Sequence, residues 1–165
     1  TIVSDKISPV EPAVLSMGEF HGGDTYNVLA DRVEIRGTFR TVTDNSRETI
    51  VKEIKNRAEN IARSQGAKIE INIQQLYPST FNNRKIVDIL RNSKHDLQLK
   101  ELEYPSLGSE DFAFYLNKIP GAIFFVGGKF ESQRKNYPLH HSQFNFNEKA
   151  LLTGLKTFLY IVDSY

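Results

Sequence analysis

The sequence contains no cysteine, and this absence excludes several kinds of site. Without cysteine the chain cannot form a disulfide bond, a thiolate zinc site or a cysteine nucleophile. It also lacks any apolar run of about 18 residues, so it offers no candidate transmembrane helix. The opening residues, TIVSDKISPVEP, have no hydrophobic stretch of the kind found in signal peptides. We therefore expect a cytoplasmic protein.

An excess of charge of either sign is absent too. The chain has 21 Lys and Arg against 20 Asp and Glu, a net charge of +1. Such a balance gives no field that attracts nucleic acid or an anionic membrane, and no strand interleaves aromatic and basic residues. Neither partner is expected. With 165 residues, 39% hydrophobic and 25% charged, the chain has the composition of a soluble globular protein with one ordinary domain or two small ones.

In the first half of the sequence, apolar and polar residues alternate as expected for a sheet with one buried and one solvent-exposed face. Residues 32–40, RVEIRGTFR, place apolar and polar residues alternately and predict a strand, which we expect to pair antiparallel with the extended segment 9–20. A helix is predicted from the capping pair Asn45 and Glu48 to a stop at Gly66. Residues 68–76, KIEINIQQL, predict a third strand. Together these elements indicate an α+β layer, an antiparallel sheet with helices on one face.

The second half reads as part of an α/β layer. A helix is expected over residues 83–95, a short strand near 97–102, and a helix capped by Ser109 that ends at 116. Residues 122–128, AIFFVGG, predict a strand buried on both faces. Asn147 is expected to cap a last helix, and the domain boundary is expected near residues 77–80. The predicted core face of the last helix comprises Leu151, Leu152, Leu155, Phe158, Leu159 and Val162.

The pair His140 and His141 is the first candidate site. Imidazole is the commonest protein ligand for transition metals, but neighbouring side chains of an extended loop point to opposite sides, so at most one of the two would bind a metal. The alternative is a surface histidine or one that lies beside a metal without binding it. The pair follows the predicted strand and its Gly127–Gly128 exit, where open α/β sheets place their ligands.

Two further patterns have an ordinary and a functional interpretation. Gly108 precedes Glu110 and Asp111, and two carboxylates in the first turn of a helix simply complement its dipole. The functional alternative is a turn that lines a pocket near the histidine loop. Asn27 in a turn and Arg40 at the end of a strand would, by themselves, be a turn residue and a solvated charge.

The other two histidines are weaker candidates. His21 lies in a glycine-rich loop, where an exposed histidine is the simpler interpretation, and His95 at a predicted helix end is read as structural.

The chain resembles the M20 family of metallopeptidases over nearly its whole length. The resemblance is closest to the amidohydrolase branch, with aminoacylases, thermostable carboxypeptidases and hydrolases of indole-acetyl-amino acids. The matching segments follow in the family's order and are PVEPAVLSMGEFHGG, NVLADRVEIRGTFR, GSEDFAFYL, PGAIFFVGG and PLHHSQFNFNEKAL.

This resemblance implies a fold and a domain division. Family members have a zinc-aminopeptidase-like α/β catalytic domain with a smaller lid, or dimerisation, domain inserted into it. Residues 1–77 would then be an incomplete lid and residues 78–165 the C-terminal segment of the catalytic domain. The resemblance implies that the general-base Glu and the other metal ligands lie upstream, so the chain by itself is expected to be inactive.

The resemblance also implies roles for individual residues. The family hydrolyses an amide next to a free carboxylate with water activated by two divalent ions, here Zn, Mn, Co or Ni. Its last metal ligand matches His140, eight positions before Glu148, with His141 as the less favoured register. Asn27 and Arg40 match its contacts to the substrate carboxylate or oxyanion, often shared across a dimer formed by the lid. Gly108, Glu110 and His141 would line the pocket beside the metals.

One departure and one alternative remain. The family's turn usually reads Asn-Val-Ile-Pro, whereas here Ala30 replaces the proline, which makes the pose of Asn27 less rigid. The expected substrate is an N-acyl amino acid or small peptide. The alternative to an enzyme is a non-enzymatic module that associates with itself through the edges of its sheet.

Overall fold

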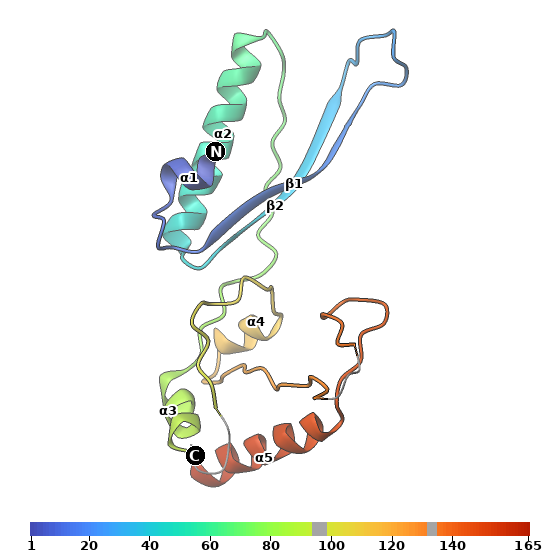
Figure 1. Cartoon of the computed structure of the whole chain (residues 1–165). Helices are drawn as coiled ribbons and strands as arrows, with labels where there is room; N and C mark the ends of the chain where they lie inside the picture. The colour runs from blue at the N-terminus through green and yellow to red at the C-terminus, as the bar shows by residue number, and fades with distance from the viewer. Residues whose placement is uncertain (94–98, 132–134) are drawn as a thin grey trace. The chain divides into compact units, whose positions relative to one another are not determined.

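The computed structural model describes residues 1–93, 99–131 and 135–165, which form two compact units. Unit 1 comprises Thr1–Ser79 and Glu103–Ser109, and unit 2 comprises Thr80–Leu102 and Glu110–Tyr165 (Figure 1). Within these described ranges no helix has the length and apolar character that crossing a membrane requires. The assignment of residues 1–77 to a lid and 78–165 to a catalytic domain stays a prediction.

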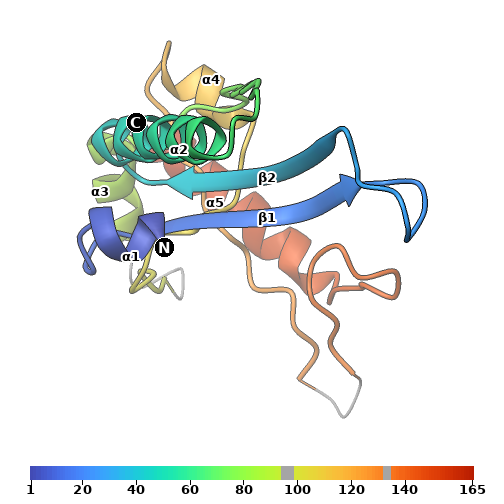
Figure 2. The ribbon, with the colours of Figure 1, turned by 90° about the horizontal axis from the view of Figure 1, so that it is seen from above.

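Unit 1 is built around a two-stranded antiparallel sheet. Strand β1 (Ala13–Gly22) pairs with β2 (Val33–Thr41), in a register that runs from Ala13 opposite Thr41 to Gly22 opposite Val33, and Figures 1 and 2 show the two side by side. This confirms the predicted antiparallel pairing. The register shifts between Met17 and Glu19, and a Cβ on Gly37 would lie 2.5 Å from the Ser16 carbonyl oxygen, so the irregular rung needs glycine there.

Helix α1 (Ile2–Lys6) packs against the long helix α2 (Asp44–Ser64). The predicted helix is present, but its start differs. Thr43 is the N-cap, with its hydroxyl accepting from the Ser46 amide at 3.2 Å, rather than the pair Asn45 and Glu48. Thr43 has the required extended backbone, whereas Asn45 is already helical. Gly66 ends the helix as predicted, at φ 64°.

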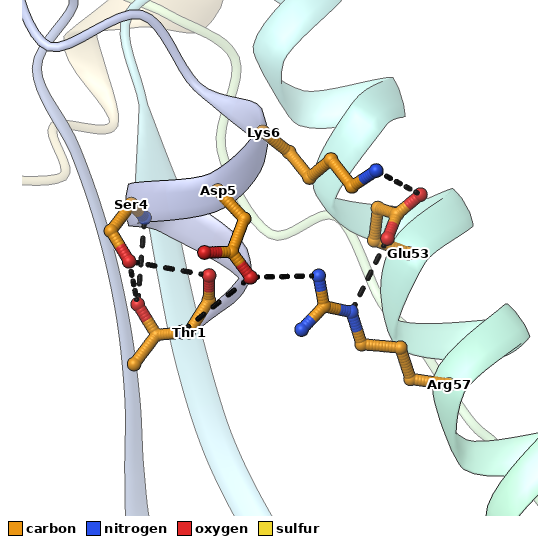
Figure 3. Close-up of polar contacts among 6 residues, drawn as sticks. All are labelled: Thr1, Ser4, Asp5, Lys6, Glu53 and Arg57. Atoms are coloured by element: carbon orange, nitrogen blue, oxygen red, sulfur yellow. Dashed lines mark hydrogen bonds and ion pairs between the residues drawn. The ribbon is translucent and has the colours of Figure 1, made fainter.

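The two helices of unit 1 are joined by ion pairs, and buried apolar side chains lie in and beside them. Ile50 is fully buried and Ile7 nearly so. Arg57 of α2 lies between two carboxylates, 3.1 Å from Asp5 and 3.3 Å from Glu53 (Figure 3). Because Asp5 is half exposed, these ion pairs orient α1 more than they stabilise it.

The predicted third strand is wrong in the described structure. Residues 68–76 keep their alternation, with Ile71 and Ile73 half-buried and their polar neighbours exposed, but they form no strand. A strand is completed by hydrogen bonds to a neighbour, and the sheet among the described residues consists of β1 and β2 alone.

Unit 2 contains α3 (Arg84–Asn92), α4 (Phe112–Leu116) and α5 (Lys149–Ser164). Helix α3 begins as predicted, since the Asn83 side chain accepts from the Lys85 amide at 3.0 Å. His95 and the start of the strand predicted at 97–102 lie outside the described residues, and residues 99–102 are not a strand.

The caps predicted for α4 and α5 differ from the structure. The N-cap position of α4 is Asp111, without a capping bond, and Ser109 instead contacts Arg40. The α5 cap is Glu148, although the Asn147 side chain accepts from the Lys149 amide at 3.1 Å. Side-chain oxygens near a helix start have several partners within reach, so sequence alone does not fix the residue that caps.

Residues 122–128 are not the buried strand that their apolar run predicts. Phe125 is 61% exposed, and near its start the segment is held by the side chain of Asn82. The Asn82 amide donates to the Ile123 carbonyl and accepts from the Ile123 amide, both at 2.9 Å. A side-chain amide thus takes the place of one backbone rung, while no described strand supplies the rest of a ladder.

The predicted core face of α5 is exposed. Its apolar residues fall on one stripe, as expected, but nothing in the described part of the chain covers them apart from isolated contacts such as Phe124 with Phe158, whose ring centroids are 5.5 Å apart. The prediction of a stripe is therefore right and that of a buried core wrong. The exposed fractions are Leu151 64%, Leu152 55%, Leu155 55%, Phe158 60%, Leu159 54% and Val162 73%.

The carboxylate of Glu11, which contacts the start of α2, is expected to make the stability of unit 1 depend on pH. Glu11 accepts from the Ser46 hydroxyl at 2.5 Å and from the Thr43 hydroxyl, and these bonds, the first above all, lower the pKa of Glu11. A lowered folded-state pKa stabilises the fold above the unfolded pKa of about 4.3, and this contribution is lost as pH falls through the folded value.

We expect Glu11→Gln to lower the midpoint of thermal unfolding at pH 7 and to leave it almost unchanged at acidic pH, where the wild-type carboxyl is itself protonated. Unfolding followed by circular dichroism across this range measures the difference. Glu59→Gln, on the exposed side of α2, removes one carboxylate elsewhere on the helix and serves as the control. An equal loss at every pH would contradict the assignment.

Candidate functional site

The predicted site residues fall into both units. Asn27, Arg40 and Gly108 belong to unit 1, whereas Glu110, His140 and His141 belong to unit 2. Within unit 1 the structure brings Arg40 to the loop that contains Gly108, and within unit 2 it places both histidines in one turn.

Asn27 lies in the exposed connection between β1 and β2. Its side-chain oxygen accepts from the Thr25 hydroxyl at 3.0 Å, and the Val28 amide donates to the Thr25 carbonyl at 3.4 Å. The bond to Thr25 fixes the orientation of the amide, so that Nδ2 is directed away and makes no hydrogen bond within the described ranges. Two N–H donors are thus presented to solvent, which suits an oxyanion or a carboxylate.

Arg40 lies near the end of β2, opposite Val14. Its Nη1 donates to the Leu107 carbonyl at 2.7 Å and to the Ser109 hydroxyl at 3.3 Å. Arg40 is therefore held by a loop 67 residues further along the chain, rather than being a freely solvated charge.

The two unit 1 candidates occupy opposite ends of the hairpin. Asn27 lies in the connection that precedes Val33, while Arg40 is seven residues further along β2, about 23 Å at the usual rise of a strand. A single small molecule is too short to contact both Asn27 and Arg40 of the same polypeptide chain.

Gly108 and Glu110 flank the point at which the chain leaves unit 1. The Gly108 amide donates to the Ser106 hydroxyl at 3.2 Å, and a Cβ on Gly108 would lie 3.3 Å from that same oxygen. Glu110 is half-buried just before α4, where its carbonyl accepts from the Ala113 amide at 3.3 Å. The pocket role of both residues stays a prediction.

His140 occupies a strained turn. The His141 amide donates to the Pro138 carbonyl at 3.2 Å, which makes His140 the third residue of a turn, and its φ is 68°. Glycine or asparagine is preferred at such a position, and other residues cost about 1–2 kcal/mol there. Backbone strain of this kind gathers at functional sites. The loop is not extended, so the argument that the two rings must oppose each other does not apply.

His141 is engaged on one side of its ring. Its Nδ1 accepts from the Gln143 amide at 3.0 Å, and the ring stacks on Tyr137 with centroids 4.4 Å apart. With Nδ1 as acceptor, the neutral ring carries its proton on Nε2 and has no lone pair left for a metal. The His140 ring makes no hydrogen bond to any described residue. This local chemistry favours His140 as the ligand, whose role stays a prediction.

The described residues do not assemble a metal centre by themselves. No three His, Asp or Glu side chains in residues 1–93, 99–131 and 135–165 gather in a way that could hold an ion. A catalytic zinc takes about three protein ligands. His140 therefore fits a metal as one donor of a set that the described residues do not complete.

Two contacts beside the candidate residues have little or no signature in the sequence. One is the grip of Leu107 and Ser109 on Arg40, which uses a backbone carbonyl and a serine that the sequence assigns to helix capping. The other closes the base of the histidine loop, where the Asn147 amide donates to the Gly128 carbonyl at 2.8 Å and a Cβ on Gly128 would lie 2.9 Å from that of Phe146. The two adjacent glycines were the only available sign of the second.

Residues 5–164 match the profile of peptidase family M20/M25/M40. A probable hydrolase of Synechocystis sp. is 36% identical over 99% of this chain and 42% of its own length, and an N-acetyldiaminopimelate deacetylase of Streptococcus uberis is 33% identical over 96% and 43%. The crystal structure of the Bacillus subtilis YXEP protein, described as a dinuclear metal-binding M20 peptidase, superposes with a TM-score of 0.73 at 30% identity, over 92% of this chain and 42% of that one. The chain thus spans less than half the length of each.

Proposed function

Because the chain belongs to peptidase family M20/M25/M40, we propose that it forms part of a metal-dependent hydrolase that cleaves the amide bond of N-acyl amino acids or small peptides. The observation that carries this proposal is the family match over residues 5–164, a range that contains both Arg40 and His140. Such a hydrolase, the whole protein, would consist of this chain together with catalytic elements that we propose lie outside it.

The residues of this chain would have three separate tasks. His140 would donate one lone pair to one of two divalent ions, Zn, Mn, Co or Ni, which when bound would supply an activated water and stabilise the oxyanion. The guanidinium of Arg40 would bind the substrate carboxylate, for which its planar fork is suited. The Nδ2 of Asn27 would donate to the oxyanion. The lid and catalytic assignments of residues 1–77 and 78–165 are part of the proposal, as is the general-base Glu outside the chain.

We further propose that the whole protein is a homodimer whose sites combine Asn27 of one copy with Arg40 of the other. The separation of these residues by the length of β2 supports the proposal, because one small substrate cannot reach both in a single copy. A twofold axis would place Asn27 of each copy beside Arg40 of the other copy and so give two equivalent composite sites. The apolar residues exposed on and beside the hairpin, Tyr26, Val28, Leu29, Val33 and Ile35, suit burial between copies.

A mixing experiment tests the function and the composite site together. In the whole protein, Asn27→Ala removes an oxyanion donor and is expected to lower kcat/KM for N-acetyl amino acids by about 100- to 1,000-fold. Arg40→Ala removes a hydrogen bond to the substrate carboxylate and is expected to lower it by about 10- to 100-fold. Dissociating and reassociating the two variants in equal amounts should restore about a quarter of wild-type activity. Half of the dimers are then mixed, and each has one intact site of two.

The matched control is a mixture of either variant with itself, taken through the same treatment, which should recover nothing. Activity that stays at the level of the single variants would place both residues in one copy's site or outside the site. A wild-type whole protein that hydrolyses no N-acyl amino acid or small peptide would overturn the proposed function itself.

A further inference from the structure

Leu107 and Ser109 bind Arg40 through a single nitrogen of its guanidinium, Nη1. Nη1 carries two N–H groups, and two oxygens lie within reach of it, the Leu107 carbonyl at 2.7 Å and the Ser109 hydroxyl at 3.3 Å. The Nε–H and both N–H groups of Nη2 make no hydrogen bond within the described ranges. Arg40 is thus held at Nη1, while Nε and Nη2 keep N–H groups that are available to a ligand.

The loop that holds Arg40 is itself ordered by local bonds. Pro105 restricts the backbone at its start, and the Ser106 hydroxyl accepts from the Gly108 amide at 3.2 Å. Gly108 lies between the two residues that bind Arg40, and the Ser106 oxygen would be 3.3 Å from a Cβ there. The turn therefore presents the Leu107 carbonyl and the Ser109 hydroxyl to the same nitrogen.

We propose that Leu107 and Ser109 form a cradle that turns the Nε–Nη2 edge of Arg40 toward the substrate, so that the carboxylate is bound side-on by two parallel hydrogen bonds. The proposal rests on the proposed function, in which Arg40 is the carboxylate-binding residue. In this assignment Ser109 is a positioning residue, which acts through Arg40 and has no contact with the reacting atoms.

The geometry of the guanidinium supports this assignment, in which Nη1 binds the cradle and the Nε–Nη2 edge binds the carboxylate. Nε–H and one N–H of Nη2 are parallel and match the spacing of the two oxygens of a carboxylate. An unrestrained arginine loses much rotamer freedom when it binds, so a side chain oriented beforehand gives tighter binding without any new contact to the ligand. Lysine carries all three of its N–H donors on one nitrogen, so it has no separate nitrogen that could be held while another binds the carboxylate.

Ser109→Ala and Ser109→Thr in the whole protein separate the cradle from a merely structural role. The probes are N-acetyl-L-alanine and N-acetyl-L-leucine, each beside its uncharged amide. Binding is measured by calorimetry on the chelator-treated protein, so that no turnover intervenes, and KM and kcat are measured on the metal-loaded protein.

Removal of the Ser109 hydroxyl is expected to weaken binding of the carboxylates, and to raise their KM, by about 3- to 10-fold, the usual effect of one hydrogen bond. Binding of the amides and kcat should stay within about twofold. Ser109→Thr keeps a hydroxyl and should behave as wild type. A general loss of structure would weaken acids and amides alike.

Each outcome decides the question. The cradle is overturned if the wild type does not prefer acids to amides, or if Ser109→Ala retains the full preference. If the wild type hydrolyses none of these compounds but prefers the acids in a manner that depends on Ser109, the proposed hydrolase is wrong and the carboxylate cradle stands. If it hydrolyses them and Ser109→Ala changes nothing, the hydrolase stands and the cradle is wrong.

Discussion

Replacement of His140 by alanine in the whole protein is expected to lower kcat/KM for N-acyl amino acids by more than about 1,000-fold. Loss of a single oxyanion donor typically costs 10²- to 10³-fold, and loss of a metal ligand removes both the activated water and a main stabiliser of the oxyanion. Metal content measured on the purified variant should fall below that of the wild type, which separates a lost ligand from a misplaced substrate.

His141→Ala is the matched variant for this experiment. It removes the neighbouring imidazole, whose Nδ1 accepts from the Gln143 amide at 3.0 Å, and should retain the metals and most of the activity. Circular dichroism on both variants checks that neither has unfolded. If His140→Ala kept its metals and activity while His141→Ala lost both, the ligand would be His141 and the register assigned here would be wrong by one residue.

The 165-residue polypeptide by itself is expected to hydrolyse no N-acyl amino acid above the buffer blank, with or without added Zn, Mn, Co or Ni. The described residues contain no group of three His, Asp or Glu able to hold an ion, and His140 supplies one donor where a catalytic zinc takes about three. Without a held metal, neither water activation nor oxyanion stabilisation is available to the rest of the site.

The measurement is release of free amino acid from a panel of N-acetyl amino acids, with the whole protein as the positive control. Folding of the polypeptide is followed by circular dichroism, since α2 alone contributes 21 helical residues. Turnover that survives purification and is removed by a chelator would show that the metal centre is complete within this chain. The division of the site proposed above would then be wrong.

The hairpin and the long helix could be predicted because their signals are local. Alternation in residues 32–40 fixes the face of each side chain, and a single antiparallel neighbour suffices to form the pair. Residues 68–76 and 122–128 have strand-like patterns of the same quality, but whether such a segment becomes a strand depends on a hydrogen-bonded neighbour. That neighbour is not encoded in the segment itself.

The same distinction explains the last helix. The spacing of Leu151, Leu155 and Phe158 correctly predicts a stripe along α5, because periodicity is a property of the helix alone. Burial depends on what lies against the stripe, and the described residues provide little there.

The candidate residues Asn27, Arg40 and His140 were assigned through the family resemblance, because by themselves Asn27 and Arg40 would be a turn residue and a solvated charge. The oxygens that orient Arg40 could not be assigned from the sequence, because a backbone carbonyl is common to every residue and serine serves many purposes. Their distance of 67 and 69 residues from Arg40 leaves no local pattern to find.

The turn at Pro138–His141 has a consequence for reading related sequences. Its third position has φ 68°, a conformation that glycine adopts without penalty, so selection for stability alone would favour glycine there. Under the proposed role of His140 as a metal ligand, the cost of this backbone conformation is offset by metal binding. A relative with glycine at this position would keep the turn without strain but would lack the proposed ligand.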